Sequence, residues 1–172
     1  MISRARRFSR AATLLLFALA GAHAGEGPPL PDGIANASYS GTEYGTVTLT
    51  DGVWEGEAWV EGGAARPRVG LAPDFLRRGD VDGDGADEAL VIVWQSSGGS
   101  GTFNYIALLD RVDGAWRNTA TTALGDRVRV TDATIGPQGV DVSVIEHDED
   151  DPACCPTRTA IRRYDTQLTP LP

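Results

Sequence analysis

Closely spaced turn signals divide most of the chain into short β-rich segments. Asp-Gly pairs occur at residues 51–52 and 113–114, and Gly-Pro-Gln-Gly occurs at residues 136–139. An Asp-Gly pair between two β-rich runs is a strong local hairpin signal. Such segments recur at intervals of about ten residues, and no long helical pattern interrupts them. The chain must therefore build its core mainly from strands.

This spacing predicts an all-β domain of eight or nine antiparallel strands joined as meandering hairpins. A sandwich, a barrel and a partial propeller all fit the pattern. The continuous apolar run at residues 89–93 is typical of a central strand, whereas the alternation at residues 127–130 predicts a strand with one face in water. We expect at most one helical turn, at residues 71–78.

The amino terminus has the three parts of a secretory signal. Four arginines precede a short apolar run that ends in Ala-His-Ala at residues 22–24. That run is too short to cross a bilayer, which needs roughly 20 apolar residues. We therefore predict a signal peptide at residues 1–24, a flexible Pro/Gly-rich entry segment at 25–33 and one domain at 34–172, with no membrane span after cleavage.

The charge of the chain limits its partners. The sequence has 15 basic and 24 acidic residues, a net charge of −9. Loss of the four leader arginines leaves 11 basic residues and a net charge of −13. This argues against nucleic acid and anionic membranes and favours cationic partners, including metal ions. The use of arginine without lysine suggests a GC-rich bacterial genome, and hence a periplasmic or secreted protein.

Five acidic residues lie within residues 80–88, directly before the apolar run. Alternate carboxylates converge on one point when the backbone curls around it, and Gly85 permits the sharp turn. Calcium prefers such all-oxygen ligands, which argue against zinc or copper. The predicted ligands are the side chains of Asp80, Asp82, Asp84 and Glu88 and the backbone carbonyl of Ala86.

Alternatives to this calcium site remain open. Asp and Gly are ordinary turn formers, so residues 80–88 could be a solvated turn. An EF-hand would need Glu at the twelfth position, which here is Val91. Arg77 and Arg78 could partly offset the charge. A second acidic run, residues 147–152, could be another cation site, a rim of the first or a solvated loop.

Two resemblances follow from these motifs. "DVDGDGADEALVIV" resembles the calcium loops of FG-GAP and integrin-type propeller repeats, with Glu88 in place of the usual Asp. A propeller would need several such repeats, and this chain has one. Together with "SSGGSGTF" and "CCPT", the loop also resembles a family of exported bacterial proteins of unknown function. That resemblance implies one folded unit and brings no activity.

Cys154 and Cys155 are adjacent, so they cannot link distant parts of the chain. An oxidising compartment favours a vicinal disulfide. An intermolecular bridge and a pair of buried free thiols are the alternatives.

The function predicted from the sequence is that of a monomeric calcium-binding β domain that holds a structural ion and recognises an unidentified protein or glycan. Trp54 and Trp59 would face opposite sides of one strand, so one of them could stack on a partner. The alternatives are a metal-dependent hydrolase using Asp82, Asp84 or Glu88, and an inhibitor or adhesion module that uses the glycine-rich loop. No catalytic residue is predicted, because Ser100 and His147 lack the other parts of a triad.

Overall fold

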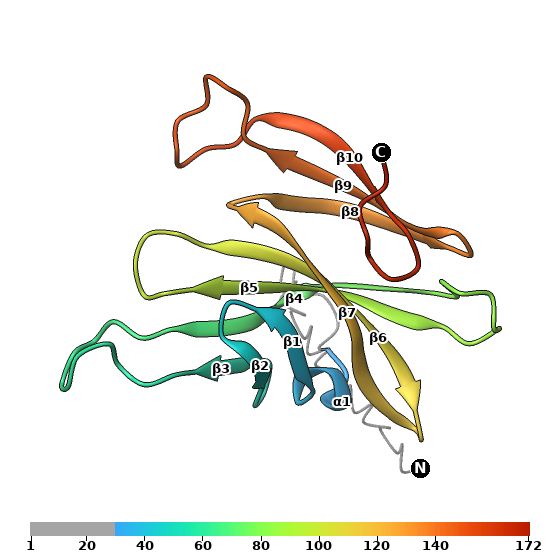
Figure 1. The fold of residues 1–172 in the computed structure, drawn as a ribbon, viewed down its shortest axis with the longest axis horizontal. Helices are drawn as coiled ribbons and strands as arrows, with labels where there is room; N and C mark the ends of the chain where they lie inside the picture. Colours follow the sequence, from blue (N-terminus) through green and yellow to red (C-terminus); the bar gives the residue numbers. More distant parts are fainter. Residues whose placement is uncertain (1–29) are drawn as a thin grey trace, which may run out of the picture.

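The computed structural model describes residues 30–172. Within them the chain forms one four-residue helix and ten strands arranged in three antiparallel sheets (Figure 1). The prediction of an all-β fold is confirmed, with slightly more strands than expected. The predicted signal peptide and most of the entry segment lie outside the described residues. Of that segment, residues 30 and 31 precede the helix α1 (Asp32–Ala35), and residues 32 and 33 form its first half.

The largest sheet has five strands in the order β3-β4-β5-β6-β7 and curls into a half-barrel (Figure 1). Its strands are β3 (Val53–Glu55), β4 (Arg68–Gly79), β5 (Glu88–Ser96), β6 (Phe103–Val112) and β7 (Ala115–Asp126). β5 occupies the centre, as the apolar run at residues 89–93 predicts. Both of its neighbours pair with it in antiparallel register.

The side chains of β5 alternate between two cores. Val91 and Val93 belong to one hydrophobic cluster, whereas Leu90 and Ile92 belong to another on the opposite face. Successive side chains of a strand point to opposite faces, so a strand buried on both sides must be continuously apolar. This two-sided burial explains the run that precedes Trp94.

The first core is covered by α1 and a two-stranded hairpin of β1 (Ser38–Thr42) and β2 (Gly45–Thr48). Tyr39 is fully buried there, and its hydroxyl donates a 2.9 Å hydrogen bond to the carbonyl of Ile34. Asn118 of β7 joins this hairpin to the main sheet, because its side-chain oxygen accepts a 3.0 Å hydrogen bond from the backbone N–H of Ser40.

The second core is covered by a three-stranded sheet in the order β10-β9-β8. Its strands are β8 (Arg129–Gly136), β9 (Gly139–Glu146) and β10 (Arg158–Tyr164). Val140, Val142 and Val144 alternate along β9 and are all buried. The molecule is thus a layered β structure with the five-stranded sheet between two smaller covers (Figure 1).

Both predicted Asp-Gly turns are present. Asp51 and Gly52 have φ of 50° and 82°, and Asp113 and Gly114 have φ of 54° and 80°. Positive φ at both central residues is the type I′ geometry that suits hairpins. The first turn, however, carries only an isolated bridge, because β2 pairs with β1 and β3 pairs with β4.

The expected helical turn at residues 71–78 is wrong, since this segment lies inside β4. The pairing of β4 with β5 is irregular between Leu71 and Leu76. Pro73 cannot donate a hydrogen bond to a neighbouring strand, and proline within a sheet is confined to edges and bulges. The segment that was expected to form a helical turn is therefore part of β4, at the point where the hydrogen-bonded pairing with β5 is interrupted.

Candidate metal centre

The acidic loop closes the hairpin between β4 and β5. Gly79, the last residue of β4, pairs directly with Glu88, the first residue of β5. The two ends of residues 80–87 are thus fixed by the central sheet. Glu88 lies two residues before Leu90, so its side chain projects from the same face, that of the second core.

Asp80 organises the first part of the loop. Its Oδ1 accepts a 2.6 Å hydrogen bond from the N–H of Gly83, and its Oδ2 accepts a 3.0 Å hydrogen bond from the N–H of Gly85. Gly83 and Gly85 have φ of 82° and 90°, in the left-handed region that favours glycine. The backbone therefore curls around the Asp80 carboxylate, as the spacing of the motif predicts.

Two further carboxylates cap the N–H groups that follow them. Asp82 Oδ1 accepts a 3.1 Å hydrogen bond from Asp84, and Asp84 Oδ1 accepts a 2.7 Å hydrogen bond from Ala86. Such side-chain-to-backbone bonds two residues ahead are typical of Asx turns. Each carboxylate keeps a second oxygen for another partner.

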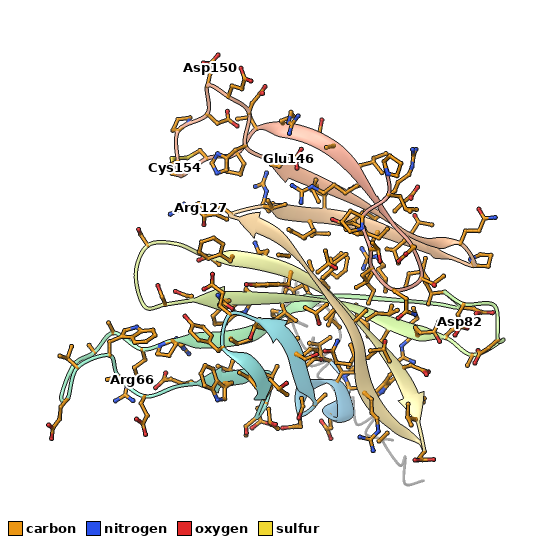
Figure 2. The ribbon with its side chains drawn as sticks, in the orientation of Figure 1. Arg66, Asp82, Arg127, Glu146, Asp150 and Cys154 are labelled. Atoms are coloured by element: carbon orange, nitrogen blue, oxygen red, sulfur yellow. A yellow bond between two sulfur atoms is a disulfide. The ribbon has the colours of Figure 1, made fainter. Side chains whose placement is uncertain are left out.

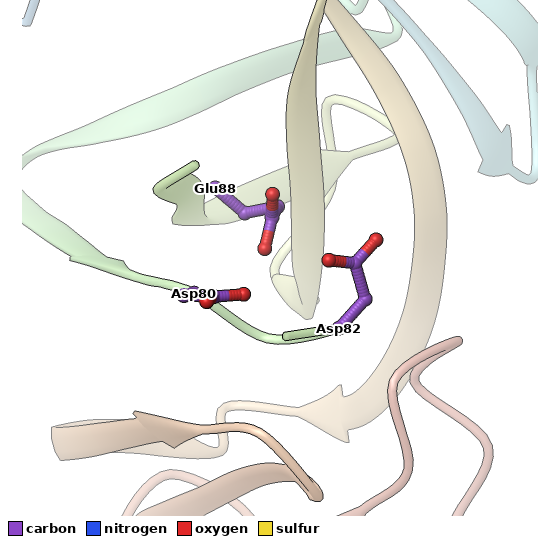
Figure 3. A group of neighbouring side chains, drawn as sticks. All are labelled: Asp80, Asp82 and Glu88. Atoms are coloured by element: carbon purple, nitrogen blue, oxygen red, sulfur yellow. The ribbon is translucent and has the colours of Figure 1, made fainter. Parts of the chain in front are cut away.

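The structure brings three of the predicted ligands together. Carboxylate oxygens of Asp80, Asp82 and Glu88 all lie within 4.8 Å of one another (Figure 3). Asp84 does not belong to this group. Its participation and that of the Ala86 carbonyl stay predictions.

Glu88 is the least ordinary member of the group. It is only 3% exposed, and its Oε2 accepts a 2.7 Å hydrogen bond from the N–H of Val81. Its Oε1 is buried and has no hydrogen-bond partner among the described residues. Burial raises the pKa of this carboxyl, the bond from Val81 lowers it, and the charges of Asp82, Asp110 and Asp84 raise it further. The carboxylate thus lies where an added cation would be strongly stabilising.

The nearby arginines do not supply that cation. The guanidinium of Arg77 pairs with Asp132 at 2.9 Å and lies 4.6 Å from the centre of the Phe75 ring. Arg78 lies 5.4 Å from the centre of the Trp116 ring. Both side chains therefore have partners elsewhere, and neither forms an ion pair with the acidic loop within the described residues, so the partial charge compensation suggested by the sequence is not seen.

The donor set fits a hard cation. All three clustered side chains offer oxygen, which suits calcium or magnesium better than zinc or copper. The buried oxygen of Glu88 that has no partner belongs to a carboxylate of this cluster, and it is the second observation that points to a ligand. An acidic group able to hold a metal ion is therefore present, and the geometry leaves the identity of the metal open.

The second acidic run forms a separate loop. Figure 2 places Asp82 and Asp150 at opposite ends of the molecule, so residues 147–152 are not a rim of the first cluster. Asp151 accepts hydrogen bonds from the N–H groups of Asp148 and Thr157 and from the Thr157 hydroxyl. These bonds hold its pKa below the ordinary value. Its carboxylate thus serves to shape this loop.

The loop also carries the two cysteines, which form a vicinal disulfide with a Cα–Cα distance of 3.8 Å. The bridge therefore joins neighbouring residues of one chain, as favoured from the sequence. Both residues are exposed, so the alternative of buried free thiols is wrong.

An exposed indole marks another surface. Trp59 is 58% exposed, and its Nε1–H donates a 2.7 Å hydrogen bond to the carbonyl of Ser97. The Tyr44 ring lies 6.5 Å from it, centre to centre, while Trp54 is partly buried. The prediction that one tryptophan of the pair is exposed is confirmed. Trp59 does not lie on a strand, however, because β3 ends at Glu55.

Sequence reasoning missed Asp110, whose charge acts on Glu88. Asp110 is isolated in the sequence and belongs to no motif. Only the pairing of β5 with β6, which the sequence does not specify, brings it near the acidic loop.

Comparison with protein-family models, with curated proteins and with solved structures finds no significant match to this chain. The two resemblances based on sequence motifs thus stay predictions. Among residues 30–172, no helix has the length and apolar character needed to cross a bilayer.

Proposed function

We propose that this protein is an exported β domain that binds calcium at residues 80–88, and that the ion stabilises the β4–β5 hairpin. The observation that carries this proposal is the buried, unpartnered Oε1 of Glu88, whose carboxylate clusters with those of Asp80 and Asp82. A bare cluster of this kind is unfavourable, because burial and mutual repulsion both oppose its charge. A bound divalent ion removes both penalties.

Calcium is favoured over magnesium for a physical reason. Calcium accepts six to eight oxygens in flexible geometry, whereas magnesium demands a near-ideal octahedron and retains its water. The clustered oxygens come from a curled loop and from the end of a strand, and all three carboxylates already accept hydrogen bonds from backbone N–H groups of the loop. Such mixed, irregular donors suit the larger ion.

Thermal unfolding of the mature chain tests the proposal. An ion that binds only the native state stabilises it by RT ln(1 + [L]/Kd), about 2.7 kcal/mol at a hundredfold excess over Kd. Extracellular calcium modules often have Kd of about 10⁻⁴–10⁻³ M, so the titration should extend to about 10 mM or beyond. We expect calcium to raise Tm and a chelator to reverse the rise, with a smaller effect of magnesium at equal concentration.

Asp82→Asn should greatly reduce the calcium-induced rise in Tm. The matched control is Asp150→Asn, which removes the same charge from an exposed site at the other end of the molecule. If wild-type protein shows no rise in calcium, or if both variants respond as wild type does, the calcium proposal fails.

Export is supported by the leader pattern and by the disulfide, which persists best in an oxidising compartment. The measurement is the mass of the processed protein recovered from periplasm or medium. A product that begins at Gly25 is expected, whereas an unprocessed cytoplasmic product would contradict export.

Surface recognition is a second candidate function, favoured by Trp59. Its indole is exposed but held by the hydrogen bond to Ser97, so little ordering entropy is lost when a partner packs on it. Exposed Glu57 and Glu61 flank it in the chain, and the protein is acidic overall. These charges favour a basic protein segment, whose arginines could stack on the ring.

Calorimetric titration with an arginine-rich peptide tests this function. Binding should weaken with salt, as electrostatic association does, and should be lost in Trp59→Ala. The control is Ile161→Ala, which removes another exposed apolar side chain from β10. Equal affinity of the two variants would contradict a role for Trp59.

A further inference from the structure

Asp110 lies directly across from Glu88 on the neighbouring strand. β5 and β6 are antiparallel, and Ala89 pairs with Leu109, so the next opposing pair is Glu88 with Asp110. Directly opposed residues of an antiparallel pair have side chains on the same face, with Cβ atoms about 4.5–5.5 Å apart. Asp110 comes from β6, outside the acidic loop and its motif.

Burial confirms which face the two carboxylates share. Leu90 follows Glu88 by two residues and Leu108 precedes Asp110 by two, and both leucines belong to the second core. Because side chains alternate along a strand, Glu88 and Asp110 project toward that same side. Glu88 is buried and Asp110 is half-buried.

Like charges directly opposite each other destabilise a sheet. The neighbouring cations do not relieve this pair. The Arg111 guanidinium lies 4.6 Å from the centre of the Trp116 ring, and Arg117, which is opposite Asp110 on β7, forms no ion pair with it within the described part of the chain. A cation from solution would relieve this repulsion.

We propose that Asp110 is a further acidic partner of the ion held by Asp80, Asp82 and Glu88. This inference rests on the proposed calcium site and extends it from one loop to the neighbouring strand. Asp110 Oδ1 accepts a hydrogen bond from the N–H of Arg111, which leaves Oδ2 to face the ion directly or through one water. The ion then connects the β4–β5 loop to β6 across the central strand pair, rather than ordering the loop alone.

The test is calorimetric calcium titration of the mature chain and of Asp110→Asn. The substitution keeps the shape of the side chain and removes its charge. Loss of a supporting partner of a metal site typically lowers affinity on the order of 10–100-fold, and we expect at least the lower value. Without calcium, Asp110→Asn should unfold at a higher temperature than wild type, because the repulsion with Glu88 is gone.

Asp113→Asn is the matched control. Asp113 lies at the tip of the β6–β7 hairpin, three residues from Asp110, and its positive φ of 54° is one that Asn also tolerates. The Asp113→Asn substitution removes the same negative charge as Asp110→Asn, only three residues away in the sequence. Its calcium affinity should stay within about twofold of wild type, because its charge faces solvent and is screened.

The outcomes separate the two proposals. If wild-type protein binds no calcium, the proposed function fails and this inference fails with it. If wild-type protein binds calcium and Asp110→Asn binds equally well, only the inference fails, and the ion belongs to the loop alone. A variant that loses affinity but is also less stable than wild type in chelator contradicts the predicted repulsion. Asp110→Ser, which shortens the side chain, distinguishes loss of charge from a packing defect, since it should show the same weakened binding.

Discussion

Replacing Glu88 by Gln should reverse the stability order of variant and wild type when calcium is added. The substitution keeps the length and shape of the side chain, so packing in the second core changes little. The introduced amide oxygen can still accept the hydrogen bond from Val81. Its NH₂ group then takes the place of the unpartnered Oε1, and the charge that Asp82, Asp110 and Asp84 repel is removed.

The magnitude follows from that exchange. A buried acceptor without a partner costs about 1–3 kcal/mol, and more when it is charged. In the absence of calcium, Glu88→Gln should recover about this amount. For a domain of roughly this size, each kcal/mol moves Tm by about 2–4 °C. The variant in chelator should therefore melt about 2–12 °C above wild type.

Calcium should then invert the difference. Wild type gains about 2.7 kcal/mol at a hundredfold excess over Kd, whereas the variant has lost the most buried ligand of the site and should gain almost nothing. Circular dichroism melts of both proteins, in chelator and in calcium, are sufficient for this comparison. Glu149→Gln, an exposed residue of the second acidic loop, is the control and should follow wild type in both conditions.

One result would refute the reasoning outright. If Glu88→Gln is less stable than wild type in chelator, the carboxylate is already satisfied without an ion, and the electrostatic basis of the site is wrong. Equal calcium responses of variant and wild type would place any bound ion elsewhere.

Three further predictions concern pH, the side chain of Asn118 and the disulfide. The pKa of the Glu88 carboxyl is raised in the folded chain, so in chelator the folded chain keeps the proton of this carboxyl to a higher pH than the unfolded chain does. The free energy of unfolding should therefore fall as pH rises from the ordinary glutamate pKa through the raised pKa of the folded state. Melts recorded at a series of pH values should show this fall in wild type and not in Glu88→Gln. Asn118→Asp should cost about 2–3 kcal/mol in urea unfolding, because its side-chain nitrogen donates to one backbone carbonyl on β6 and another on β7, whereas a carboxylate would repel both; an unchanged midpoint would show that these bonds contribute nothing. Replacing Cys154 and Cys155 together by Ser should change global stability by at most about 1 kcal/mol, since the closed loop is minimal, and a loss of several kcal/mol would contradict this view of the bridge.

Local sequence signals predicted much of the strand pattern. The Asp-Gly turns adopt the expected positive φ values, and the apolar run after Glu88 forms the central strand. Both features depend on interactions between residues that are close together in the chain, so they can be predicted from the sequence. The same holds for the curling of the loop around Asp80, because glycines at positions 83 and 85 permit left-handed backbone.

Non-local pairing could not be predicted in this way. The first Asp-Gly turn looked like an ordinary hairpin, yet the strands on either side of it join different sheets. Pro73 and its neighbours suggested a helical turn, but pairing with β5 keeps this segment in the sheet on both sides of an irregularity. In each case contacts with distant strands outweigh a local preference.

The same distinction between local and non-local interactions applies to the candidate site. Spacing within the loop identified Asp80, Asp82 and Glu88 before any fold was known. The burial of Glu88 and the position of Asp110 opposite it depend on the register of β5 against its neighbours. Glu88 is the most buried carboxylate of the site, and only the three-dimensional structure brings Asp110 next to it.

The most direct measurement is a crystal structure of the mature protein grown with millimolar calcium, with anomalous data collected to identify the ion. A peak with calcium's anomalous signal is predicted between the carboxylates of Asp80, Asp82 and Glu88, at about 2.3–2.6 Å from their oxygens. Water alone at that position, with the Glu88 oxygen still unpartnered, would contradict the proposal that a cation completes this loop.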